Sequence, residues 1–277
     1  MNQGKLIILG SGGFISSEVV KILNKKKKKF ELIPRKKIDL TRISEIINLK
    51  KHIKKNDIIL FIAAKAPAKN IQMFYSNIKM VLNFSSIINQ IKFKKLVYIS
   101  SDAVYSDNKK KITENSKKEP KNWHGLMHLT RENILKGIIN DKKLLILRPT
   151  LIYGKNDPHN GYGPNQFFRQ AIKKKEIKIF GNGEELRDHI WVTDLSKIIF
   201  KMLYSKLYGD FNLVTGKLIS FYKIANIFSE IYKVKITKLV RKGKMPHKGY
   251  RPISNAKLLK HFPNFKFQNI KNIIKNY

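Results

Sequence analysis

Two histidines supply the side chains best suited to proton transfer at neutral pH. His124 and His128 stand four residues apart within Trp123–Glu132, and a helix there would place them one turn apart. A neutral imidazole, with a pKa of about 6.5, accepts a proton at pH 7 without help from a neighbouring cation. The pair could act as acid and base, pack in the core, or bind a metal ion. Because no acid stands between them as in zinc proteases, we expect no metal site.

Two hydroxyl groups follow a run of apolar residues. Leu96–Ile99 reads as a buried strand, and Ser100 and Ser101 come directly after it. The pair could lie close to a catalytic centre, together with the glycine turn described below, or could merely cap the strand end.

A glycine-rich turn near the amino end points to a phosphate group. Residues 5–9 predict a strand buried on both faces, and apolar spacing from Phe14 onward predicts a helix. Gly10, Gly12 and Gly13 fall between the two. A strand, a glycine turn and a helix together aim backbone N–H groups and a helix N-terminus at a phosphate. The alternative is a tight turn without a ligand.

Three segments resemble the extended short-chain dehydrogenase/reductase family, which includes the NAD-dependent epimerases, dehydratases and reductases of sugar nucleotides. They are Gly10-x-x-Gly13-x-x-Ser16, Ser100-Ser-x-x-Val-Tyr105 and Arg187-Asp-His-Ile-Trp-Val-Thr-Asp194. Serine replaces the usual third glycine at position 16. The larger departure is at the family's Tyr-x-x-x-Lys, where this chain has His124 and His128.

The resemblance implies roles for the serine and the histidines. In the family, the second hydroxyl residue after the strand bonds the reacting oxygen, the tyrosine moves a proton, and the lysine binds the nicotinamide ribose. Carried onto this chain, Ser101 polarises the oxygen, His124 is the acid/base and His128 contacts the ribose.

The resemblance also implies an NAD or NADP site. No acid follows the second strand (30–33), and Arg35 with its lysine neighbours could hold a 2′-phosphate, which favours NADP. Asp39 either contacts the adenine or caps the segment from Thr41. The expected cofactor contacts are Gly10, Ser11, Gly12, Gly13, Phe14, Ile15, Arg35, Asp39, Leu40, Ala63, Ala64 and Pro149.

A nucleotide-activated sugar is the implied substrate. Arg187 and Arg251 match family arginines that hold its diphosphate, a role suited to the planar guanidinium. Asn165 matches a residue near the same diphosphate, and Ser100 completes the expected substrate contacts.

The expected fold is α/β, a Rossmann-type doubly wound parallel sheet with a smaller α/β substrate lobe from the carboxyl half. We expect the dinucleotide-binding domain to take residues 1–154 and 188–210, and the substrate lobe residues 155–187 and 211–277. Family members commonly dimerise, so a homodimer is expected.

The predicted function is NAD(P)-dependent epimerisation or keto reduction of a nucleotide sugar, in the synthesis of polysaccharide or cell-surface glycan precursors. Dehydration is least favoured, because Asp102-Ala103 stands where dehydratases usually carry an Asp-Glu pair. The alternative is a catalytically inactive dinucleotide sensor or an RNA-binding scaffold on the same fold.

Composition limits the partners and the cellular location that we expect. The 277 residues carry a formal charge of +38, yet only eight of the 57 basic residues are arginine, and the lysines are scattered. Abundant Lys, Ile and Asn fit A/T-rich codon usage, so a nucleic-acid partner is not expected. The chain has no cysteine and no apolar run long enough to span a membrane, which predicts a cytoplasmic protein.

Overall fold

The chain forms two compact units. The computed structural model describes residues 4–107 and 110–277. Unit 1 takes in the chain up to Ser106 together with Ser116–Pro149 and Ser196–Phe211, and unit 2 takes in Asp107–Asn115, Thr150–Leu195 and Asn212–Tyr277. Residues 150–154 and 188–195, which the sequence placed in the dinucleotide-binding domain, therefore group with unit 2.

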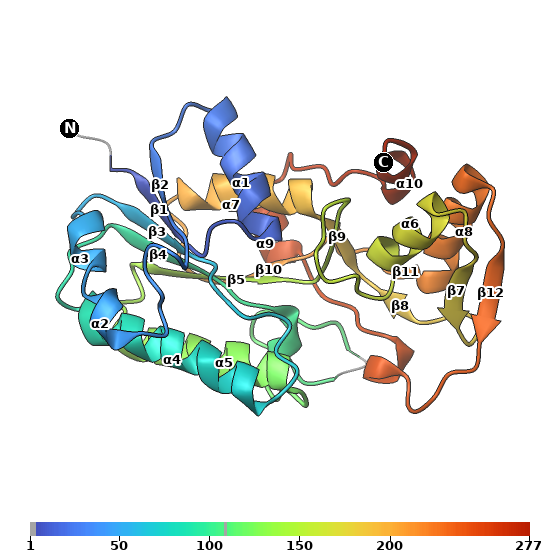
Figure 1. The fold of residues 1–277 in the computed structure, drawn as a ribbon, viewed down its shortest axis with the longest axis horizontal. Coiled ribbons are helices and arrows are strands. Elements are labelled where there is room, and N and C mark those ends of the chain that lie inside the picture. The colour runs from blue at the N-terminus through green and yellow to red at the C-terminus, as the bar shows by residue number, and fades with distance from the viewer. Residues whose placement is uncertain (1–3, 108–109) are drawn as a thin grey trace. The chain divides into compact units, whose positions relative to one another are not determined.

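A six-stranded sheet in the order β10-β5-β4-β3-β1-β2 forms the centre of unit 1 (Figure 1). Its strands are β1 (Leu6–Leu9), β2 (Phe30–Ile33), β3 (Ile58–Phe61), β4 (Lys95–Ile99), β5 (Leu144–Pro149) and β10 (Gly209–Leu213). Strands β1 to β5 pair in parallel, with Leu6 opposite both Phe30 and Ile58. The order reverses between β1 and β3, so this is the predicted doubly wound Rossmann-type sheet.

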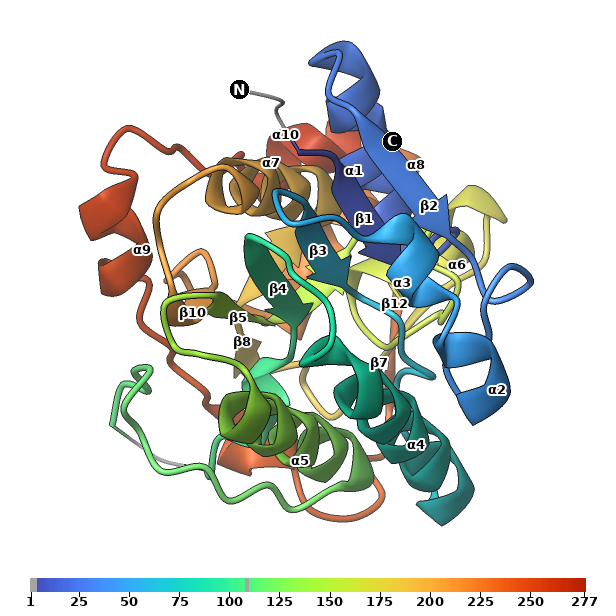
Figure 2. The same ribbon diagram turned by 90° about the vertical axis from the view of Figure 1, so that its left-hand side faces the viewer.

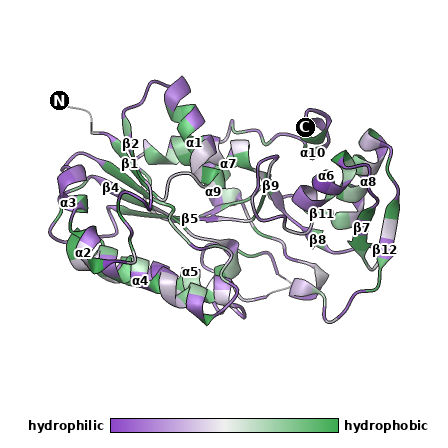
Figure 3. Ribbon diagram, in the orientation of Figure 1, coloured by the Kyte–Doolittle hydropathy of each residue, from purple (hydrophilic) through white to green (hydrophobic). Residues whose placement is uncertain are grey.

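Helices cover both faces of this sheet. They are α1 (Phe14–Lys25), α2 (Ile43–Ile46), α3 (Leu49–His52), α4 (Ile71–Ile88), α5 (Trp123–Ile138) and α7 (Val192–Leu203), with a 3₁₀ turn η1 (Asp102–Val104) after β4. Helices α1 and α7 lie on one face, and α4 and α5 lie side by side on the other (Figures 1 and 2). The strands are largely hydrophobic, whereas the helices alternate in hydropathy (Figure 3), as expected for a sheet covered on both faces.

Unit 2 has three two-stranded pairings and an aromatic core. Strand β6 (Leu151–Tyr153) pairs with β9 (His189–Trp191), β7 (Ile177–Phe180) with β12 (Ile236–Leu239), and β8 (Leu186–Arg187) with β11 (Ile219–Ser220). Its further helices are α6 (Pro164–Ile172), α8 (Phe221–Tyr232), the 3₁₀ turn η2 (Pro246–Gly249), α9 (Ala256–His261) and α10 (Ile270–Lys275). Phe167, Phe221 and Phe228 pack between α6, α8 and β7.

A buried ion pair fixes α5 against the carboxyl end of the sheet. Arg148 on β5 donates from Nε and Nη2 to the two carboxylate oxygens of Glu132, at 2.8 and 2.6 Å, and both side chains are at most 1% exposed. Asp210 on β10 takes a further contact from Arg148, and the Tyr105 hydroxyl accepts from it at 2.8 Å. Burial alone would lower the pKa of Arg148, but the bonds and charge of Glu132 raise it above its ordinary value, so the guanidinium stays charged.

We expect Glu132→Gln to destabilise unit 1 by about 3–5 kcal/mol, because it leaves a buried guanidinium with half of its countercharge removed. The matched control is Glu119→Gln, whose partner Lys117 is exposed, with side-chain exposures of 61% and 75%. That change should cost less than about 1 kcal/mol. Urea unfolding measures both free energies, and equal losses in the two variants would contradict the structural role of the pair.

Candidate active site

The glycine turn has the geometry that only glycine allows. Gly10 and Gly12 have φ angles of +95° and +88°. A Cβ on Gly10 would lie 2.4 Å from the Ala63 Cα, so the turn packs backbone to backbone against the segment after β3. A Cβ on Gly12 would meet no described atom within 4 Å. Gly10 is therefore required by packing as well as by φ, whereas Gly12 faces open space.

Ser16 explains how the chain dispenses with a third glycine. Its side chain is buried; the hydroxyl accepts from the Gly13 amide at 2.9 Å and donates to the Gly13 carbonyl at 3.0 Å. Ser16 thus bonds back to Gly13, the residue that precedes the first turn of α1. Helices leave the N–H groups of their first turn without intrahelical partners, so those of Phe14 and Ile15 are the donors that α1 offers to an anion.

The segment after β2 is held by its own hydrogen bonds. Arg35 is mostly exposed and donates to Asp39 at 2.9 Å. Asp39 accepts from the amide and hydroxyl of Thr41, and the Leu40 carbonyl accepts from Asn83 on α4 at 2.9 Å. Burial would raise the pKa of Asp39, but the bonds from Thr41 and Arg35 lower it to about 2. Asp39 therefore closes the turn at Thr41; it does not cap a helix, because α2 begins at Ile43 with Arg42 as its N-cap.

Ala63 and Ala64 begin a loop that α4 holds in place. Asn77 on α4 is fully buried, and its side-chain amide bonds both the N–H and the carbonyl of Lys65, at 2.9 and 3.0 Å. The loop runs on to Ala68, whose backbone nitrogen lies 3.4 Å from Nδ1 of His124. Asn77 thus holds the loop that runs from Ala63, the wall against which the glycine turn packs, to Ala68, which lies beside His124.

The two serines after β4 have different surroundings. Ser101 is half-buried and caps η1, with its hydroxyl accepting from the Ala103 amide at 3.2 Å. Ser100 is 3% exposed and donates to Glu132 at 2.6 Å. Ser100 was expected to contact substrate; in the structure its hydroxyl donates into the buried Arg148–Glu132 network.

Helix α5 carries both histidines toward the end of β4. Asn122 caps it by accepting from the Gly125 amide at 2.8 Å, and a Cβ on Gly125 would lie 2.1 Å from the Ala103 carbonyl. Gly125 is the residue after His124, and Ala103 is two residues after Ser101. Their close contact therefore brings the segments of the two predicted catalytic residues together. Pro149, the expected nicotinamide contact, is buried at the end of β5.

His128 lies deeper than the sequence implied. It is 4% exposed, with Nδ1 2.7 Å from the Tyr98 hydroxyl, and its ring centroid is 4.7 Å from that of His124. Burial first, then His124 and Arg131, hold the pKa of His128 well below its usual value, so the ring is neutral at pH 7. Sequence reasoning missed Tyr98, Arg131, Glu132 and Arg148, although the rarity of arginine was a usable signal.

In unit 2 the two predicted diphosphate arginines are paired with carboxylates. Arg187 contacts Glu185 at 3.2 Å, and Arg251 donates to Asp107 at 2.9 Å. A β-bridge between Leu186 and Tyr250 makes the two segments neighbours. The side-chain amide of Asn165 bonds Gly154 and Ile152 at 3.0 and 3.3 Å and so anchors the loop after β6.

Further charged groups join these arginines. His247 contacts Asp107 and lies 3.0 Å from Nη1 of Arg251, and Arg241 lies 3.7 Å from Glu185. Burial first, then Arg187 and Arg251, lower the pKa of His247. Neither His247 nor Arg241 was singled out from the sequence.

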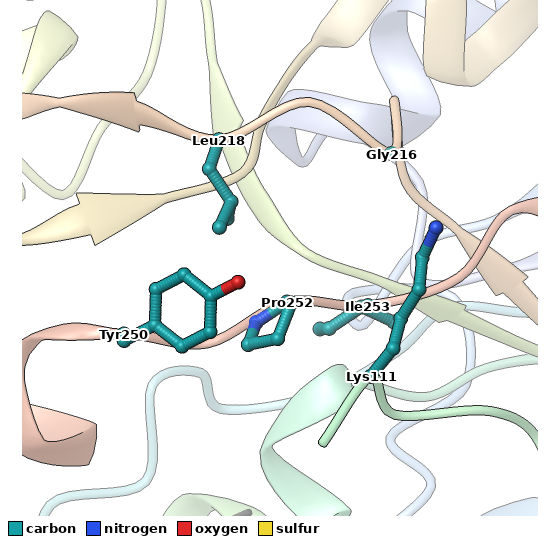
Figure 4. A pocket seen from close by; sticks show the side chains of 6 residues that line it. All are labelled: Lys111, Gly216, Leu218, Tyr250, Pro252 and Ile253. Atoms are coloured by element: carbon teal, nitrogen blue, oxygen red, sulfur yellow. The ribbon is translucent and has the colours of Figure 1, made fainter. Parts of the chain in front are cut away.

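A hollow of about 310 Å³ lies in unit 2, next to Arg251 in sequence (Figure 4). Leu218 faces Tyr250 and Pro252 across it, and the Lys111 side chain extends toward Gly216. Apolar walls with one phenol and one ammonium suit a ligand that has both a planar or apolar part and an anionic part.

The described part of the chain offers neither a metal cluster nor a membrane span. Across residues 4–107 and 110–277, no three His, Asp, Glu or Cys side chains are grouped so as to hold a metal ion. Among the same residues, no helix is both long and apolar enough to cross a membrane.

His189 on β9 is a buried histidine within the Arg187–Asp194 segment. It is 7% exposed and stacks edge-on against Phe221, at 5.4 Å between ring centroids. Neither ring nitrogen has a well-formed hydrogen bond within the described residues, and only a marginal contact with the Arg187 backbone opposes the effect of burial. Burial, followed by Arg187, lowers the pKa of His189 to about 3.

We predict that His189→Leu flattens the acid limb of the stability profile. The unfolded histidine takes up a proton below about pH 6.5, whereas the folded one resists it until about pH 3. Native stability is therefore present above pH 6.5 and falls on acidification, by up to about 1.4 kcal/mol per pH unit for this group. Urea unfolding between pH 4 and 7 should show that slope removed in the variant, and an unchanged slope would contradict the burial of a neutral ring.

Comparison with known proteins agrees with this architecture. The family model of the NAD dependent epimerase/dehydratase family matches residues 6–213. The "uncharacterized UDP-glucose epimerase YtcB" of Bacillus subtilis is 26% identical over 198 residues, and the match covers 67% of this chain and 60% of that relative's length. The chain thus spans less than two thirds of that relative.

Solved structures share the fold. A GDP-L-fucose synthetase from Naegleria fowleri bound to NADP has a TM-score of 0.83 at 17% identity, covering 99% of this chain and 92% of the other. The Thermus thermophilus UDP-glucose 4-epimerase complex with NAD has a TM-score of 0.81 at 20% identity, covering 98% and 96%. With three quarters of its length matched by the family model, this chain belongs to the NAD dependent epimerase/dehydratase family.

Proposed function

We propose that the protein is an NAD(P)-dependent epimerase or keto-reductase of a nucleotide-activated sugar, acting in the synthesis of polysaccharide or surface-glycan precursors. One observation carries the proposal. In unit 1, the positive-φ glycine turn packs against Ala63, and the loop from Ala63 leads to Ala68 beside His124. The glycine turn proposed to bind phosphate and the histidine proposed to transfer the proton are thus linked by one series of contacts within unit 1.

The residues of unit 1 fit a dinucleotide. Gly10 to Ile15 would hold its pyrophosphate, Ala63 and Ala64 would let the protein backbone approach it closely, and Pro149 would lie beside the nicotinamide. Arg35, with Lys36 and Lys37 beside it, follows β2 without an accompanying free acid, since Asp39 is committed to Thr41 and Arg35. We therefore favour NADP over NAD.

When bound, the nicotinamide supplies or takes up a hydride at a sugar carbon. His124 moves the matching proton on the sugar oxygen, and Ser101 hydrogen-bonds that oxygen. The contact between Ala68 and Nδ1 of His124 favours a neutral ring with its proton on Nε2. If His124 is to accept a proton on Nε2, its neutral ring must carry its own proton on Nδ1 instead. The 3.4 Å contact between the Ala68 amide and Nδ1 is then lost, at a cost of about 1 kcal/mol.

Arg187 and Arg251 are proposed to bind the substrate diphosphate. Each is already paired with a carboxylate, so a diphosphate competes with Glu185 and Asp107 for the guanidinium groups. The hollow beside Tyr250 and Lys111 would take a further part of the substrate. Ser100 and Asn165 would complete the substrate contacts through the hydrogen-bonding capacity that their bonds within the fold leave.

One observation favours the alternative of an inactive dinucleotide sensor. The burial of His128 against Tyr98 is compatible with packing alone. Such a sensor would bind NAD(P) without any turnover. An RNA-binding scaffold would instead bind RNA at moderate salt, with no response to sugar nucleotides.

The deciding experiment mixes the purified protein with NADPH or NADH and with UDP-, GDP- or dTDP-linked sugars and 4-keto-sugars. We expect turnover with at least one of them, and His124→Ala should lower kcat by about 10²- to 10⁴-fold. His52→Ala, on α3 and paired with Glu31, is the control and should leave kcat unchanged. Turnover that survives His124→Ala would refute the proton-transfer role.

We also propose a homodimer through α4 and α5. These adjacent helices expose apolar side chains, with Tyr75 65%, Leu82 51% and Leu126 39% accessible. Two copies pairing these faces would remove that surface from water. Sedimentation should report a dimer that Leu82→Glu weakens, whereas a monomer at all concentrations would contradict it.

A further inference from the structure

Arg131 is a buried cation for which no role has been assigned. It lies on α5, one turn beyond His128, and its residue exposure is 0%. Nη2 donates to the Ala63 carbonyl at 3.0 Å. The guanidinium carbon lies 4.6 Å from the centre of the Phe61 ring and 5.1 Å from that of Tyr98. The side chain therefore bridges the wall of the glycine turn and the phenol that contacts His128.

Packing alone does not explain a buried guanidinium at this position, because its burial is unfavourable. Nε and Nη1 of Arg131 have no hydrogen-bond acceptor among the described residues. Burying a guanidinium carries a desolvation penalty, which the cation–π contacts and the single bond to the Ala63 carbonyl offset only in part. An apolar side chain such as methionine would fill the same space between Phe61 and Tyr98 without that cost. The positive charge itself thus needs an explanation.

The charge acts on the Tyr98–His128 contact. Its position over the Tyr98 ring makes the phenol a stronger hydrogen-bond donor, although burial keeps the pKa of Tyr98 above its usual value. A phenol that donates to Nδ1 of His128 leaves the imidazole proton on Nε2. The same positive charge repels a second proton from the ring.

Other charged groups near His128 oppose this effect only in part. From its own helix, His124 also disfavours a second charge; besides burial, Glu132, paired with Arg148, raises the pKa of Tyr98, as a smaller cause than the opposing one from Arg131. From β4, Tyr98 is the facing group. Helix α4, which packs along α5, carries Tyr75 and Lys79, both exposed to solvent.

We propose that Arg131 is a positioning residue that holds His128 as a neutral imidazole with its proton on Nε2, and ties this state to the Ala63 wall of the glycine turn. His128 then presents an uncharged N–H donor of fixed direction, suited to a hydroxyl or carbonyl oxygen of a bound ligand. The catalytic consequence rests on the proposed function, whereas the state of His128 does not.

Nitrogen NMR of the ligand-free protein, labelled with ¹⁵N-histidine, tests the proposal between pH 4 and 8. In the wild type, His128 should show the Nε2–H pattern throughout. Arg131→Met should raise the midpoint of His128 protonation by about one pH unit or more. Arg131→Lys, which keeps the charge, should behave like the wild type. A proton on Nδ1 in the wild type, or a Met variant indistinguishable from it, would overturn the proposal.

Tyr98→Phe gives a second test should Arg131→Met fail to fold. It keeps the cation and removes the hydroxyl, so His128 should populate both tautomers yet still resist protonation. A single Nε2–H tautomer in this variant would also overturn the proposal. Because these spectra need neither substrate nor turnover, absence of enzymatic activity would refute the proposed function without deciding the role of Arg131.

Discussion

The placement of the site depends on the buried ion pair between Arg148 and Glu132. This pair joins the end of β5 to the middle of α5, and through Ser100, Tyr105 and Asp210 it reaches the segments around β4 and β10. Paired charges without solvent tolerate little displacement, because any lost bond leaves a desolvated charge. Helix α5 is therefore held to the carboxyl edge of the sheet, and the position of His124 follows from it.

A second constraint keeps the imidazole of His128, next to His124, uncharged. In water, histidine would be partly protonated near neutral pH, and a cation at the site would repel the other positive groups of this basic chain. Burial at His128, together with its neighbours His124 and Arg131, removes that charge. The loop that Asn77 organises sets Ala68 against His124 from the other side. The histidine pair is thus defined by backbone and aromatic contacts as much as by its own sequence spacing.

The sequence predicted what depends on local pattern. The strand–glycine–helix unit followed from apolar runs and from spacing, and the doubly wound sheet from the resemblance to the family; the structure confirms both. The partners of Ser100 and Arg251 could not be read in this way. Ser100 bonds a residue 32 positions away, and Arg251 is paired with a residue 144 positions away. A residue's partner at such separation is fixed by packing, which no local pattern encodes. Arg131 carried one signal, its rarity among lysines, but its burial against two aromatic rings appears only in three dimensions.

The proposed role of unit 1 is to bind a dinucleotide beside the His124–His128 pair. Calorimetric titration of the purified protein with NADPH and NADH is its sharpest test. We expect saturable binding of one dinucleotide per chain, tighter for NADPH, and strongly weakened in Gly10→Ala, where the new Cβ would collide with Ala63. Absence of saturable binding for both dinucleotides in the folded wild-type protein would contradict it.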